Sequence, residues 1–592
     1  MSFAAFRSNL RQAAFTLRAI GYALANLRPT KRISPAALVE AHAKANPTGA
    51  AILFESRRIS HAELDRAANR YANALLSLGV RKGDVVALVM DNRPEYVIAI
   101  AGGSKIGVVT SLVNTHVGGA QLEHALRICS PALVLAGSEH VAKLDEIRDA
   151  LPVGLDRVLV WSDGDDHGSI EGATSFDAIL ERSSEANPGR TRVQKGEDPL
   201  LYIYTSGTTG FPKAALWRND RFFRAAGIFS QVLLRIDPSH VVYGSGLPMY
   251  HSSGVVLGWG VALAGGATFA MRRKFSASGH WEDCERFGAT HFMYIGELCR
   301  YLYNAPPHPK ERAHRIQAIL GAGLRPEIWE GFQARFAIPK VYEFYGATEG
   351  NVGLVNIEGV PGMMGRLLRD HDVFRALPGT AEIERDAEGR AVRAKPGEKG
   401  ILVGRITRLN RFDGYVDKAK NEEKILRNPL GDGRDYFNTG DLVKLHEGRW
   451  VSFVDRLGDT FRWKGENVST NEVQEVLNRF DGVQESNVFG VEVPHADGRA
   501  GMAAMVVDER FDLDGFAEYV KRNLPSYARP LFLRLQREMR VTATFKHVKT
   551  DLREDGFDPS KVGDDRLYFL EDRYVPLTEA IHRAIASGEI RL

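Results

Sequence analysis

Apolar and polar positions along the chain follow two alternating spacings. From residue 34 to about 455, helix-spaced stretches such as HAELDRAANRYANALLSLG (61–79) alternate with short apolar runs such as VVALVM (85–90) and ALVLAG (132–137). Apolar residues at steps of three and four predict amphipathic helices, and short apolar runs between them predict buried strands. This order predicts an α/β fold, with a large domain over 34–455 built of parallel-sheet subdomains and helices.

The pattern changes near residue 455. The segment KLHEGRWVSFVDRLGD (444–459) predicts a hairpin that ends in a charged, glycine-containing turn, which is typical of a domain boundary. Beyond it, the spacing predicts helices over 471–480 and 513–524 and strands over 483–493 and 503–508. We therefore expect a small C-terminal α+β domain over 456–592, and the family resemblance described below implies that this domain is mobile.

Residues 1–33 predict a basic amphipathic helix. Eight apolar residues fall within an arc of roughly 120° on a helix: Phe3, Phe6, Leu10, Ala13, Leu17, Ile20, Leu24 and Leu27. Arg7, Arg11 and Arg18 cluster beside this arc, and the first acidic residue of the chain is Glu40. Two interpretations stay open: residues 1–28 lie on an anionic membrane surface, or the helix packs on the protein's own surface. The scattered arginines do not fit a signal peptide.

A second apolar segment covers residues 241–271 and contains no Asp, Glu, Lys or Arg. Its last 18 residues just reach the length of a membrane-spanning helix. Seven glycines and Pro248 favour a buried helix and strand of the α/β core instead.

Composition narrows the function classes. The chain has 592 residues, of which 44% are hydrophobic and 26% charged, as in a soluble globular protein of several domains. A net charge of +3 gives no general attraction to nucleic acid, so no nucleic-acid partner is expected. Cys129, Cys284 and Cys299 form no CxxC pair, which fits a reducing compartment. We expect a cytoplasmic protein, with peripheral attachment to the inner face of the cell membrane as the open alternative.

One loop carries clear chemistry. The segment YIYTSGTTGFPKAA (202–215) follows an apolar strand and gathers hydroxyls, glycines and a lysine: Thr205, Ser206, Gly207, Thr208, Thr209, Gly210 and Lys213. Such a loop can turn backbone N–H groups and hydroxyls toward phosphate oxygens, with the lysine as a countercharge. Its spacing does not fit the G-x-x-x-x-G-K-[ST] loop of kinases and related ATPases.

Five further segments follow in order: YEFYGATEG (342–350), FNTGDL (437–442), DRLGDTFRWKGENVSTNEV (455–473), LPSYARP (524–530) and TATFKHVK (542–549). With the phosphate loop, they resemble the motifs of the adenylate-forming superfamily, whose members activate carboxylates with ATP. GDTFRWKGENVST and the tail over 557–592 are similar to the fatty-acid transport protein or very-long-chain acyl-CoA synthetase branch.

This resemblance implies an AMP-forming ligase. A long- or very-long-chain fatty acid would react with ATP in the presence of Mg²⁺ to give an acyl-adenylate, and CoA would then form the thioester. Four alternatives remain open: a sterol or bile-acid side chain as substrate, fatty-acid uptake that works by CoA trapping, a transporter with little ATP chemistry, and transfer of the adenylate to a carrier protein. The oligomeric state is not predicted.

The resemblance also assigns roles by position. Thr348 would bind the α-phosphate, Glu349 would bind Mg²⁺, and Lys213 and Lys546 would neutralise phosphate charge. Tyr345 and the 321–323 turn would enclose adenine, and Asp441 would accept the ribose hydroxyls beside Arg456. The remaining nucleotide-site residues are Gly323, Gly346, Ala347 and Asn467. His251 and Gly465 would line the acyl and CoA entrance, and Gly458 or Asp459 would be the pivot of domain movement.

Overall fold

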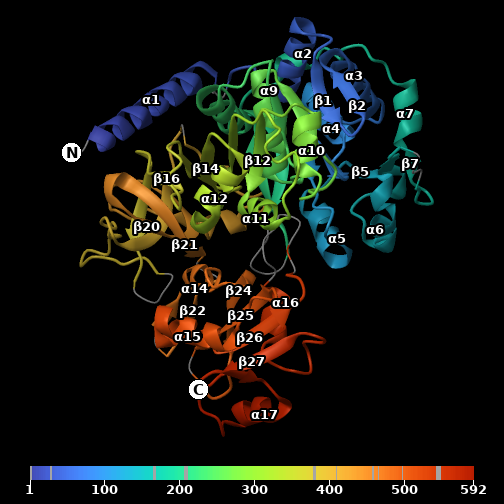
Figure 1. Cartoon of the computed structure of the whole chain (residues 1–592). Helices are drawn as coiled ribbons and strands as arrows, with labels where there is room; N and C mark the ends of the chain where they lie inside the picture. Colours follow the sequence, from blue (N-terminus) through green and yellow to red (C-terminus); the bar gives the residue numbers. More distant parts are fainter. Residues whose placement is uncertain are drawn as a thin grey trace. The chain divides into compact units, whose positions relative to one another are not determined.

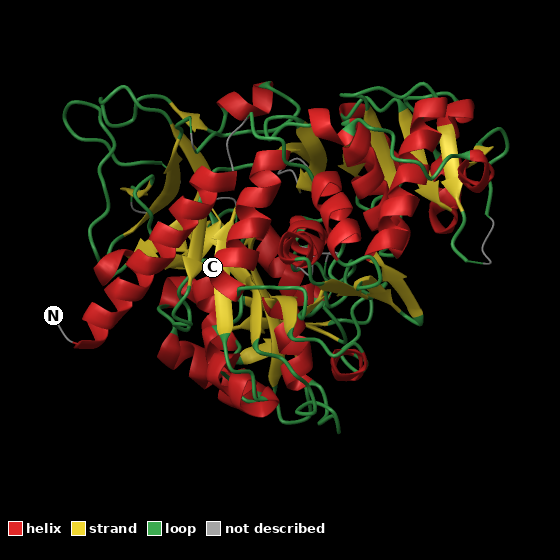
Figure 2. Ribbon diagram, turned by 90° about the horizontal axis from the view of Figure 1, so that it is seen from above, coloured by secondary structure: helices red, strands yellow, loops and turns green. Residues whose placement is uncertain are grey.

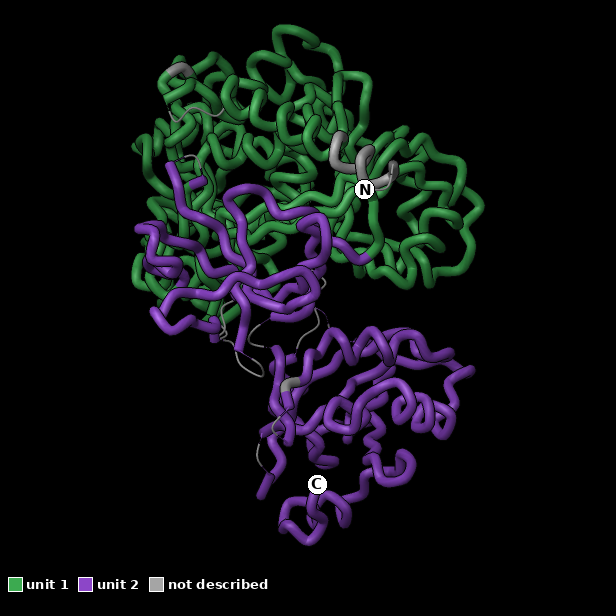
Figure 3. Tube along the Cα trace, turned by 90° about the vertical axis from the view of Figure 1, so that its left-hand side faces the viewer, with its two compact units in different colours: residues 1–361, 411–423 green, residues 362–410, 424–592 purple. Residues whose placement is uncertain are grey.

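The computed structural model describes residues 3–26, 30–164, 168–205, 211–377, 382–408, 410–456, 459–464, 466–496, 498–539, 541 and 549–592, with the side chains of 3–10, 192 and 467 left out. The chain divides into two compact units (Figure 3). Unit 1 comprises Met1–Pro361 and Arg411–Glu423, and unit 2 comprises Gly362–Asn410 and Lys424–Leu592. Each unit is described by itself.

Unit 1 contains two mainly parallel sheets in the described part of the chain (Figure 1). The first has the order β15-β14-β13-β12-β10-β11-β1-β2. Its strands are β1 (Ala50–Phe54), β2 (Arg57–Ser60), β10 (Val241–Tyr243), β11 (Thr268–Met271), β12 (His291–Ile295), β13 (Ala318–Ala322), β14 (Val341–Gly346) and β15 (Gly353–Asn356). The second has the order β7-β6-β5-β3-β4-β8-β9. Its strands are β3 (Val85–Val89), β4 (Val109–Leu112), β5 (Leu133–Gly137), β6 (Val158–Trp161), β7 (Thr174–Ser175), β8 (Pro199–Thr205) and β9 (Lys213–Arg218).

Helices connect and flank these strands (Figure 2). They are α1 (Phe3–Asn26), α2 (Pro35–Ala45), α3 (His61–Ser77), α4 (Pro94–Ile106), α5 (Gly119–Ile128), α6 (Val141–Glu146), α7 (Phe176–Arg182), α8 (Asn219–Gly227), α9 (Val261–Gly265), α10 (His280–Arg286), α11 (Gly296–Asn304), α12 (Pro326–Phe336) and α13 (Ala419–Glu422). Two π-helical turns are η5 (Ile228–Leu234) and η6 (Ser253–Gly260). Short 3₁₀ turns cover Ser138–His140, Arg148–Ala150, Leu155–Arg157 and Thr191–Val193.

The local sequence explains where these elements begin and how deeply they lie. Ser60 and Glu63 form a reciprocal capping box at the start of α3, which satisfies backbone N–H groups that the first turn leaves unpaired. All five residues of β3 are buried, as expected for a parallel strand covered on both faces. The predicted parallel-sheet subdomains with helices are confirmed for this part of the chain.

The apolar segment over 241–271 folds inside unit 1. It forms β10, the turn η6, α9 and β11, and every residue of η6 and β11 is buried. The prediction of a buried helix and strand is therefore confirmed. Among the helices of the described ranges, none combines the length and apolar content needed to cross a membrane.

The N-terminal helix α1 lies against η5 with the face opposite to its apolar stripe. Tyr22 is the contact: a Cβ atom at Gly227 would lie 1.8 Å from its hydroxyl oxygen. Burial raises the pKa of the Tyr22 hydroxyl to about 12. In contrast, Leu17, Ile20 and Leu24 are 69%, 49% and 59% exposed. These three residues of the apolar stripe are therefore not used for packing within α1's own unit.

Unit 2 contains antiparallel and mixed sheets in its described residues. The six-stranded sheet has the order β16-β21-β20-β18-β17, with β19 paired to β20. These strands are β16 (Gly365–Arg366), β17 (His371–Arg375), β18 (Lys399–Arg405), β19 (Ile425–Leu426), β20 (Tyr436–Leu445) and β21 (Trp450–Arg456). A two-stranded sheet joins β22 (Phe461–Trp463) to β23 (Glu466–Val468). The five-stranded sheet runs β24 (Val483–Glu492), β25 (Arg499–Val507), β26 (Phe532–Gln536), β27 (Arg566–Leu570) and β28 (Tyr574–Pro576).

The helices of the C-terminal part of unit 2 cover its five-stranded sheet. They are α14 (Thr470–Leu477), α15 (Leu513–Asn523), α16 (Thr550–Asp555) and α17 (Glu579–Ser587), and short 3₁₀ turns cover Glu447–Arg449 and Ser526–Ala528. A single apolar cluster joins β24, β25 and β26 to α14 and α15 through residues such as Leu477, Phe489 and Phe516. The predicted C-terminal α+β fold is confirmed, as are its two central helices.

One expectation about sheet type is wrong. The sequence pattern predicted parallel-sheet subdomains up to residue 455, but the strands of the six-stranded sheet between Gly365 and Arg456 pair antiparallel. The physical reason lies in the connections, because short turns such as 446–449 between β20 and β21 permit only hairpins. The predicted hairpin over 444–459 belongs to this sheet.

Candidate active site

The phosphate loop is the tip of a hairpin in unit 1. Thr205 ends β8 and Lys213 begins β9, and the two residues are register partners. The hydroxyl oxygen of Thr205 is buried and has no hydrogen-bond partner among the described residues. Lys213 Nζ lies 5.5 Å from the centroid of the Tyr415 ring. The structure thus brings a hydroxyl and an ammonium to one end of the hairpin. The loop residues between them lie outside the described ranges: Ser206, Gly207, Thr208, Thr209 and Gly210.

The YGATEG loop follows β14 and is held through its backbone. Trp217 Nε1 donates to the carbonyl oxygen of Thr348 at 3.0 Å. One guanidinium nitrogen of Arg221 donates to the carbonyl oxygens of Thr348 and Gly350, both at 2.7 Å, and of Ala347 at 3.4 Å. Because β9 leads directly into α8, the strand that begins at the phosphate-loop lysine also anchors this second motif.

Arg221 is a largely buried cation, with a side chain 13% exposed, that the sequence analysis missed. Its guanidinium stacks 4.4 Å from the Trp217 ring centroid. Burial lowers the pKa of Arg221 to about 10, while the negative charges of Asp413 and Glu349 act in the opposite direction. Arg221 therefore places positive charge beside the half-buried Glu349 and fixes the loop on both sides of it. A lone arginine in a helix gives no signal in a single sequence, because its partners are carbonyl oxygens 126 to 129 positions away.

The turn assigned to adenine follows β13. Gly323 has a φ of +83°, a conformation that favours glycine. The turn packs tightly on the start of α11, since a Cβ atom at Gly296 would lie 1.7 Å from the Gly323 carbonyl oxygen. Tyr345 lies on the adjacent strand β14 and is half-buried, and Gly346 after it is exposed. The structure therefore places the proposed base-binding residues on neighbouring strand ends.

Unit 2 holds the residues assigned to the ribose. Asp441 on β20 is the register partner of Arg456 on β21, and Arg456 Nε lies 3.7 Å from Asp441 Oδ1. The Asp441 side chain is 12% exposed and that of Arg456 is 52% exposed. Gly440 before it has a φ of +76°, and the backbone N–H of Asp441 donates to Thr439 Oγ1 at 3.1 Å. The pair assigned to ribose is thus brought together by strand register.

The hinge segment after Arg456 is fixed by charges. Asp459 accepts a hydrogen bond from Arg553 at 3.1 Å and lies 3.6 Å from Lys549 Nζ. Burial lowers the pKa of Lys549, and the carboxylates of Asp459 and Asp455 act against this effect. These contacts anchor Asp459, one of the two pivot candidates. Gly458, Gly465 and Lys546 lie outside those ranges, and the side chain of Asn467 is also not described.

His251 belongs to a local turn. Its Nδ1 lies 2.9 Å from Ser253 Oγ and accepts the backbone N–H of Ser253 at 3.3 Å. These bonds position the His251 ring at the start of η6. Its role at the acyl and CoA entrance stays a prediction. Nearby, Tyr250 is buried and its hydroxyl lies 3.3 Å from His116 Nδ1.

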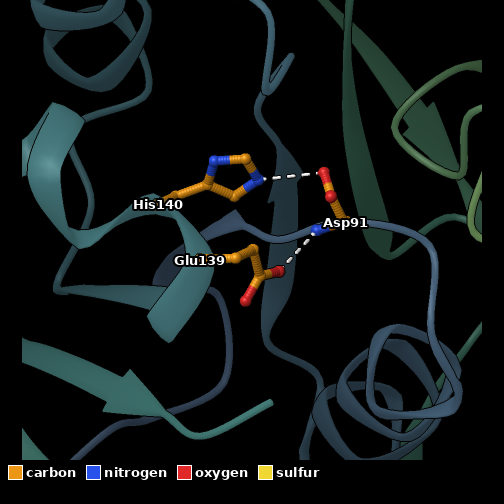
Figure 4. Close-up of side chains that lie close together, drawn as sticks. All are labelled: Asp91, Glu139 and His140. Atoms are coloured by element: carbon orange, nitrogen blue, oxygen red, sulfur yellow. Dashed lines mark hydrogen bonds and ion pairs between the residues drawn. The ribbon is translucent and has the colours of Figure 1, made fainter. Parts of the chain in front are cut away.

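Three potential metal ligands lie together away from these motifs. Ligand atoms of Asp91, Glu139 and His140 lie within 4.8 Å of one another (Figure 4). His140 Nε2 is 3.0 Å from Asp91 Oδ1, and the Asp91 backbone N–H donates to Glu139 Oε1 at 2.9 Å. The buried guanidinium of Arg93 lies 3.9 Å from Glu139 Oε2. Because this cation already balances the carboxylates, we assign the cluster to an ion-pair network that joins the end of β3 to that of β5.

Comparison with known proteins agrees with this geometry. Residues 39–416 match the family described as AMP-binding enzyme. The chain is 38% identical to the long-chain fatty acid transport protein 2 of Rattus norvegicus, covering 95% of this chain and 92% of that protein. It is also 38% identical to the medium/long-chain-fatty-acid–CoA ligase FadD6 of Mycobacterium tuberculosis, covering 88% of this chain and 86% of that protein.

The fold has a counterpart among solved structures. The anthranilate CoA ligase AuaEII, in complex with anthranoyl-AMP, aligns with a TM-score of 0.76 at 20% identity, covering 90% of this chain and 98% of that one. At this identity the alignment shows a shared fold. Together with the matched family and the relatives at 38% identity, it confirms the resemblance read from the six motifs. The chain belongs to the AMP-binding enzyme family, in the group that contains the long-chain fatty acid transport proteins and FadD6.

Proposed function

We propose that this chain is an AMP-forming fatty-acid–CoA ligase for medium- to very-long-chain acids. The relatives named above suggest the substrate class. The observation that carries the proposal is the anchoring of the YGATEG loop by Trp217 and Arg221, which positions Thr348 and Glu349 from the strand that begins at Lys213. The hydroxyl of Thr348, the carboxylate of Glu349 and the ammonium of Lys213 are groups that can act together on the phosphates of ATP.

The chemistry needs positioning more than acid–base catalysis. A fatty-acid carboxylate is ionised at neutral pH and attacks the α-phosphorus of ATP, so that pyrophosphate leaves. The CoA sulfur then attacks the acyl carbon, and the bond from this carbon to the AMP oxygen breaks. In this scheme Thr348 donates to an α-phosphate oxygen, Lys213 neutralises phosphate charge, and Tyr345 with the 321–323 turn holds the base.

Glu349 is the residue that would hold Mg²⁺. A half-buried carboxylate next to phosphate oxygens is a hard oxygen ligand, as Mg²⁺ prefers, and the buried Thr205 hydroxyl offers a further polar group toward the phosphates. A bound Mg²⁺ would neutralise phosphate charge. Arg221 is the neighbouring cation, and the negative charge of Glu349 acts to raise its pKa.

Residues of unit 2 complete the proposal. Asp441 would accept the ribose hydroxyls beside Arg456, Asn467 and Gly465 would contribute to the nucleotide and CoA contacts, and Lys546 would act on the phosphates in the first step only. Replacement of Lys546 by alanine should abolish acyl-adenylate formation but leave the conversion of supplied acyl-adenylate and CoA to thioester near the wild-type rate. Equal losses in both half-reactions would contradict separate conformations for the two steps.

The direct test is substrate profiling. Purified protein is incubated with ATP, Mg²⁺, CoA and a series of saturated fatty acids of increasing length, with a bile acid as the alternative substrate, and AMP release is followed. We expect CoA-dependent AMP release that is largest with long chains. Larger AMP release with the bile acid than with any fatty acid would indicate a sterol side chain as the substrate. No AMP release with any acid would contradict the proposed ligase activity. Uptake of fatty acid by CoA trapping would use the same activity.

We further propose that α1 attaches the enzyme to anionic membranes. The exposed side chains of Leu17, Ile20 and Leu24 form one stripe, and Arg11 and Arg18 are exposed beside it. A basic helix with a solvent-facing apolar stripe binds the membrane interface, where each arginine contributes roughly 1 kcal/mol near an anionic surface. The proposal is therefore of a peripheral enzyme at the inner face of the cell membrane.

Vesicle co-sedimentation tests this attachment. Replacing Leu17, Ile20 and Leu24 together by serine should reduce binding to vesicles that contain phosphatidylserine and leave turnover of short, soluble acids unchanged. The matched control replaces Ala14 and Ala25, which are exposed outside the apolar face, by serine and should bind as wild type. Equal binding by the triple-serine protein would contradict the attachment.

A further inference from the structure

A buried carboxylate stands behind the turn assigned to adenine. Glu343 lies on β14, two residues before Tyr345, and its register partner on β13 is Gly321. Its Oε2 accepts the backbone N–H of Gly323 at 3.1 Å, and its Oε1 accepts that of Leu324 at 2.8 Å. Glu343 is 7% exposed, so both bonds are shielded from water. One side chain thus satisfies two consecutive N–H groups of the turn.

The turn has little other freedom at this point. Gly323 is in the left-handed region, and its carbonyl oxygen packs against Gly296 so closely that no Cβ atom would fit there. A Cβ atom at Gly321 would lie 2.1 Å from the Tyr294 carbonyl oxygen. The backbone from 321 to 324 is therefore pressed onto the β12–α11 junction on one side and bonded to Glu343 on the other. Any weakening of the carboxylate bonds changes the position of this turn first.

Tyr294 completes the arrangement. Its hydroxyl donates to Glu343 Oε1 at 2.8 Å, and the carbonyl oxygen of Tyr342 lies 3.1 Å away as a second acceptor. With Glu343 ionised, the hydroxyl donates to the carboxylate. With Glu343 protonated, the carboxyl O–H can donate to the tyrosine oxygen while the tyrosine hydroxyl turns to the Tyr342 carbonyl. Both states are accommodated, but a protonated oxygen is a weaker acceptor for the Leu324 N–H.

We propose that Glu343 is a positioning residue for the nucleotide base, whose ionised carboxylate holds the 321–324 turn in the form that binds adenine against Tyr345. This inference rests on the proposed ATP-dependent function and deepens it. Glu343 does not touch the reacting atoms. Its effect is on affinity for ATP, with the reaction rate at saturation left nearly unchanged.

The charge state of Glu343 changes near neutral pH. Burial raises the pKa of this carboxyl to about 7, against the lowering effect of the bonds from Leu324, Tyr294 and Gly323. The described titratable groups that face it are Tyr294 on β12 and Cys299 on α11, and burial raises both of their pKa values well above the ordinary range. These two groups stay neutral near pH 7, so Glu343 is the group that titrates there. The hydrogen bonds from the Gly323 and Leu324 N–H groups to Glu343 therefore become stronger as pH rises through about 7.

Steady-state kinetics with the full-length chain test the proposal. KM for ATP is measured for wild type and for Glu343→Gln between about pH 6 and pH 8.5, and the ratio of the two values removes the titration of ATP itself. At pH 8 the variant should have a KM about tenfold higher, because its amide presents a donor where the turn needs an acceptor. The ratio should fall toward one at pH 6, and kcat should change less than about threefold. A ratio that is near one at pH 8, or that does not vary with pH, would overturn the proposal.

A second variant keeps the carboxylate. Tyr294→Phe removes the hydroxyl that lowers the Glu343 pKa, so the pH at which KM for ATP rises should move upward. The matched control is Asp283→Asn, which alters another buried carboxylate that accepts a tyrosine hydroxyl, from Tyr243 at 2.9 Å, outside the turn. It should lower the melting temperature without changing the pH profile of KM. A control that reproduces the Glu343→Gln effects would assign them to general destabilisation.

Hydrogen exchange separates this inference from the ligase proposal. Amide exchange of a peptide covering 320–325 is compared at pH 8 between wild type and Glu343→Gln, without any substrate. Faster exchange in the variant is expected whether or not the chain turns over ATP. Unchanged exchange would contradict the anchoring by Glu343. Faster exchange in a chain with no wild-type AMP release would instead contradict the proposed function alone.

Discussion

The candidate residues of unit 1 and those of unit 2 are held in place by different physical means. In unit 1, the YGATEG loop is held by side chains from far earlier in the chain, since Trp217 donates to the carbonyl of a residue 131 positions later. In unit 2, Asp441 and Arg456 face each other because β20 and β21 are neighbouring strands of one hairpin. The first arrangement depends on a buried cation and its backbone partners. The second depends on strand register.

This difference predicts where substitutions act most strongly. Removing a buried donor leaves carbonyl oxygens without partners, which costs more than the bond itself contributed. Removing an exposed partner from a register pair leaves the backbone ladder intact, and water replaces the lost contact. Residues outside the motifs should therefore matter in unit 1, and within the register pair of unit 2 the carboxylate should matter more than its exposed partner.

Among the residues compared here, the largest effect is expected at the proposed metal ligand. Glu349→Gln should lower the rate of ATP–pyrophosphate exchange by about 10²- to 10³-fold, because a neutral amide is a poor ligand for a divalent ion beside phosphates. The melting temperature should stay near that of wild type, since the loop is anchored through backbone oxygens. Wild-type turnover that persists in excess EDTA would contradict the metal role.

The anchor of the loop should come next. Arg221→Ala should lower adenylation by about 10- to 100-fold and also lower the melting temperature, because three carbonyl oxygens lose a charged donor. The matched control is Arg218→Ala at the end of β9, three residues before Arg221, whose guanidinium lies 3.5 Å from Asp413 and whose side chain is 28% exposed. Arg218→Ala should change adenylation much less. Similar losses of adenylation in both variants would show that a positive charge in this region, and not the anchoring of the loop by Arg221, is what matters.

Smaller effects, on KM for ATP, are expected at the register pair Asp441 and Arg456 of unit 2. Asp441→Asn should raise KM for ATP by about tenfold, because an amide accepts the ribose hydroxyls less well than a carboxylate. Arg456→Ala should raise it by less than about threefold, since this side chain is half exposed and lies 3.7 Å away. A larger loss from Arg456 than from Asp441 would reverse the assigned roles.

The smallest effect concerns stability and pH. The Glu343 carboxyl has a folded pKa of about 7, raised by burial above its ordinary value of 4.5. The folded chain therefore binds this proton more tightly, and the corresponding stability is present below about pH 4.5 and lost as pH rises through 7. The melting temperature of wild type relative to Glu343→Gln should accordingly be higher by a few degrees at pH 5 than at pH 8. An equal difference at both pH values would contradict the raised pKa.

Sequence reasoning found the motif residues because their chemistry is local. Thr348, Glu349 and Asp441 lie in short segments with a fixed order of residue types. The family resemblance put Arg456 beside Asp441, and the two residues are register partners in the structure. Arg221 and Glu343 could not be found in this way. Their partners are backbone atoms of other elements, and a backbone atom leaves no trace in the amino-acid pattern.

The fold shows the same division. Strands such as β3 and β5 and helices such as α3 were predicted from periodicity alone, because burial on known faces imposes that periodicity. Apart from the predicted hairpin over 444–459, the antiparallel pairing over 365–456 was missed, since apolar runs mark strands but not their direction. For α1, the stripe was visible in the sequence, but only the structure shows that Leu17, Ile20 and Leu24 face solvent and Tyr22 faces the protein.

The most direct test of the central claim follows one oxygen atom. If the fatty-acid carboxylate attacks the α-phosphorus of ATP and CoA then displaces AMP from the acyl carbon, one carboxylate oxygen must remain on the AMP phosphate. Purified protein is incubated with ATP, Mg²⁺, CoA and a long-chain fatty acid that carries heavy oxygen in both carboxylate positions, and the products are analysed by mass spectrometry. We predict AMP with one heavy oxygen and an acyl-CoA formed in equal amount. AMP without heavy oxygen, or ADP as the nucleotide product, would contradict the acyl-adenylate route for this chain.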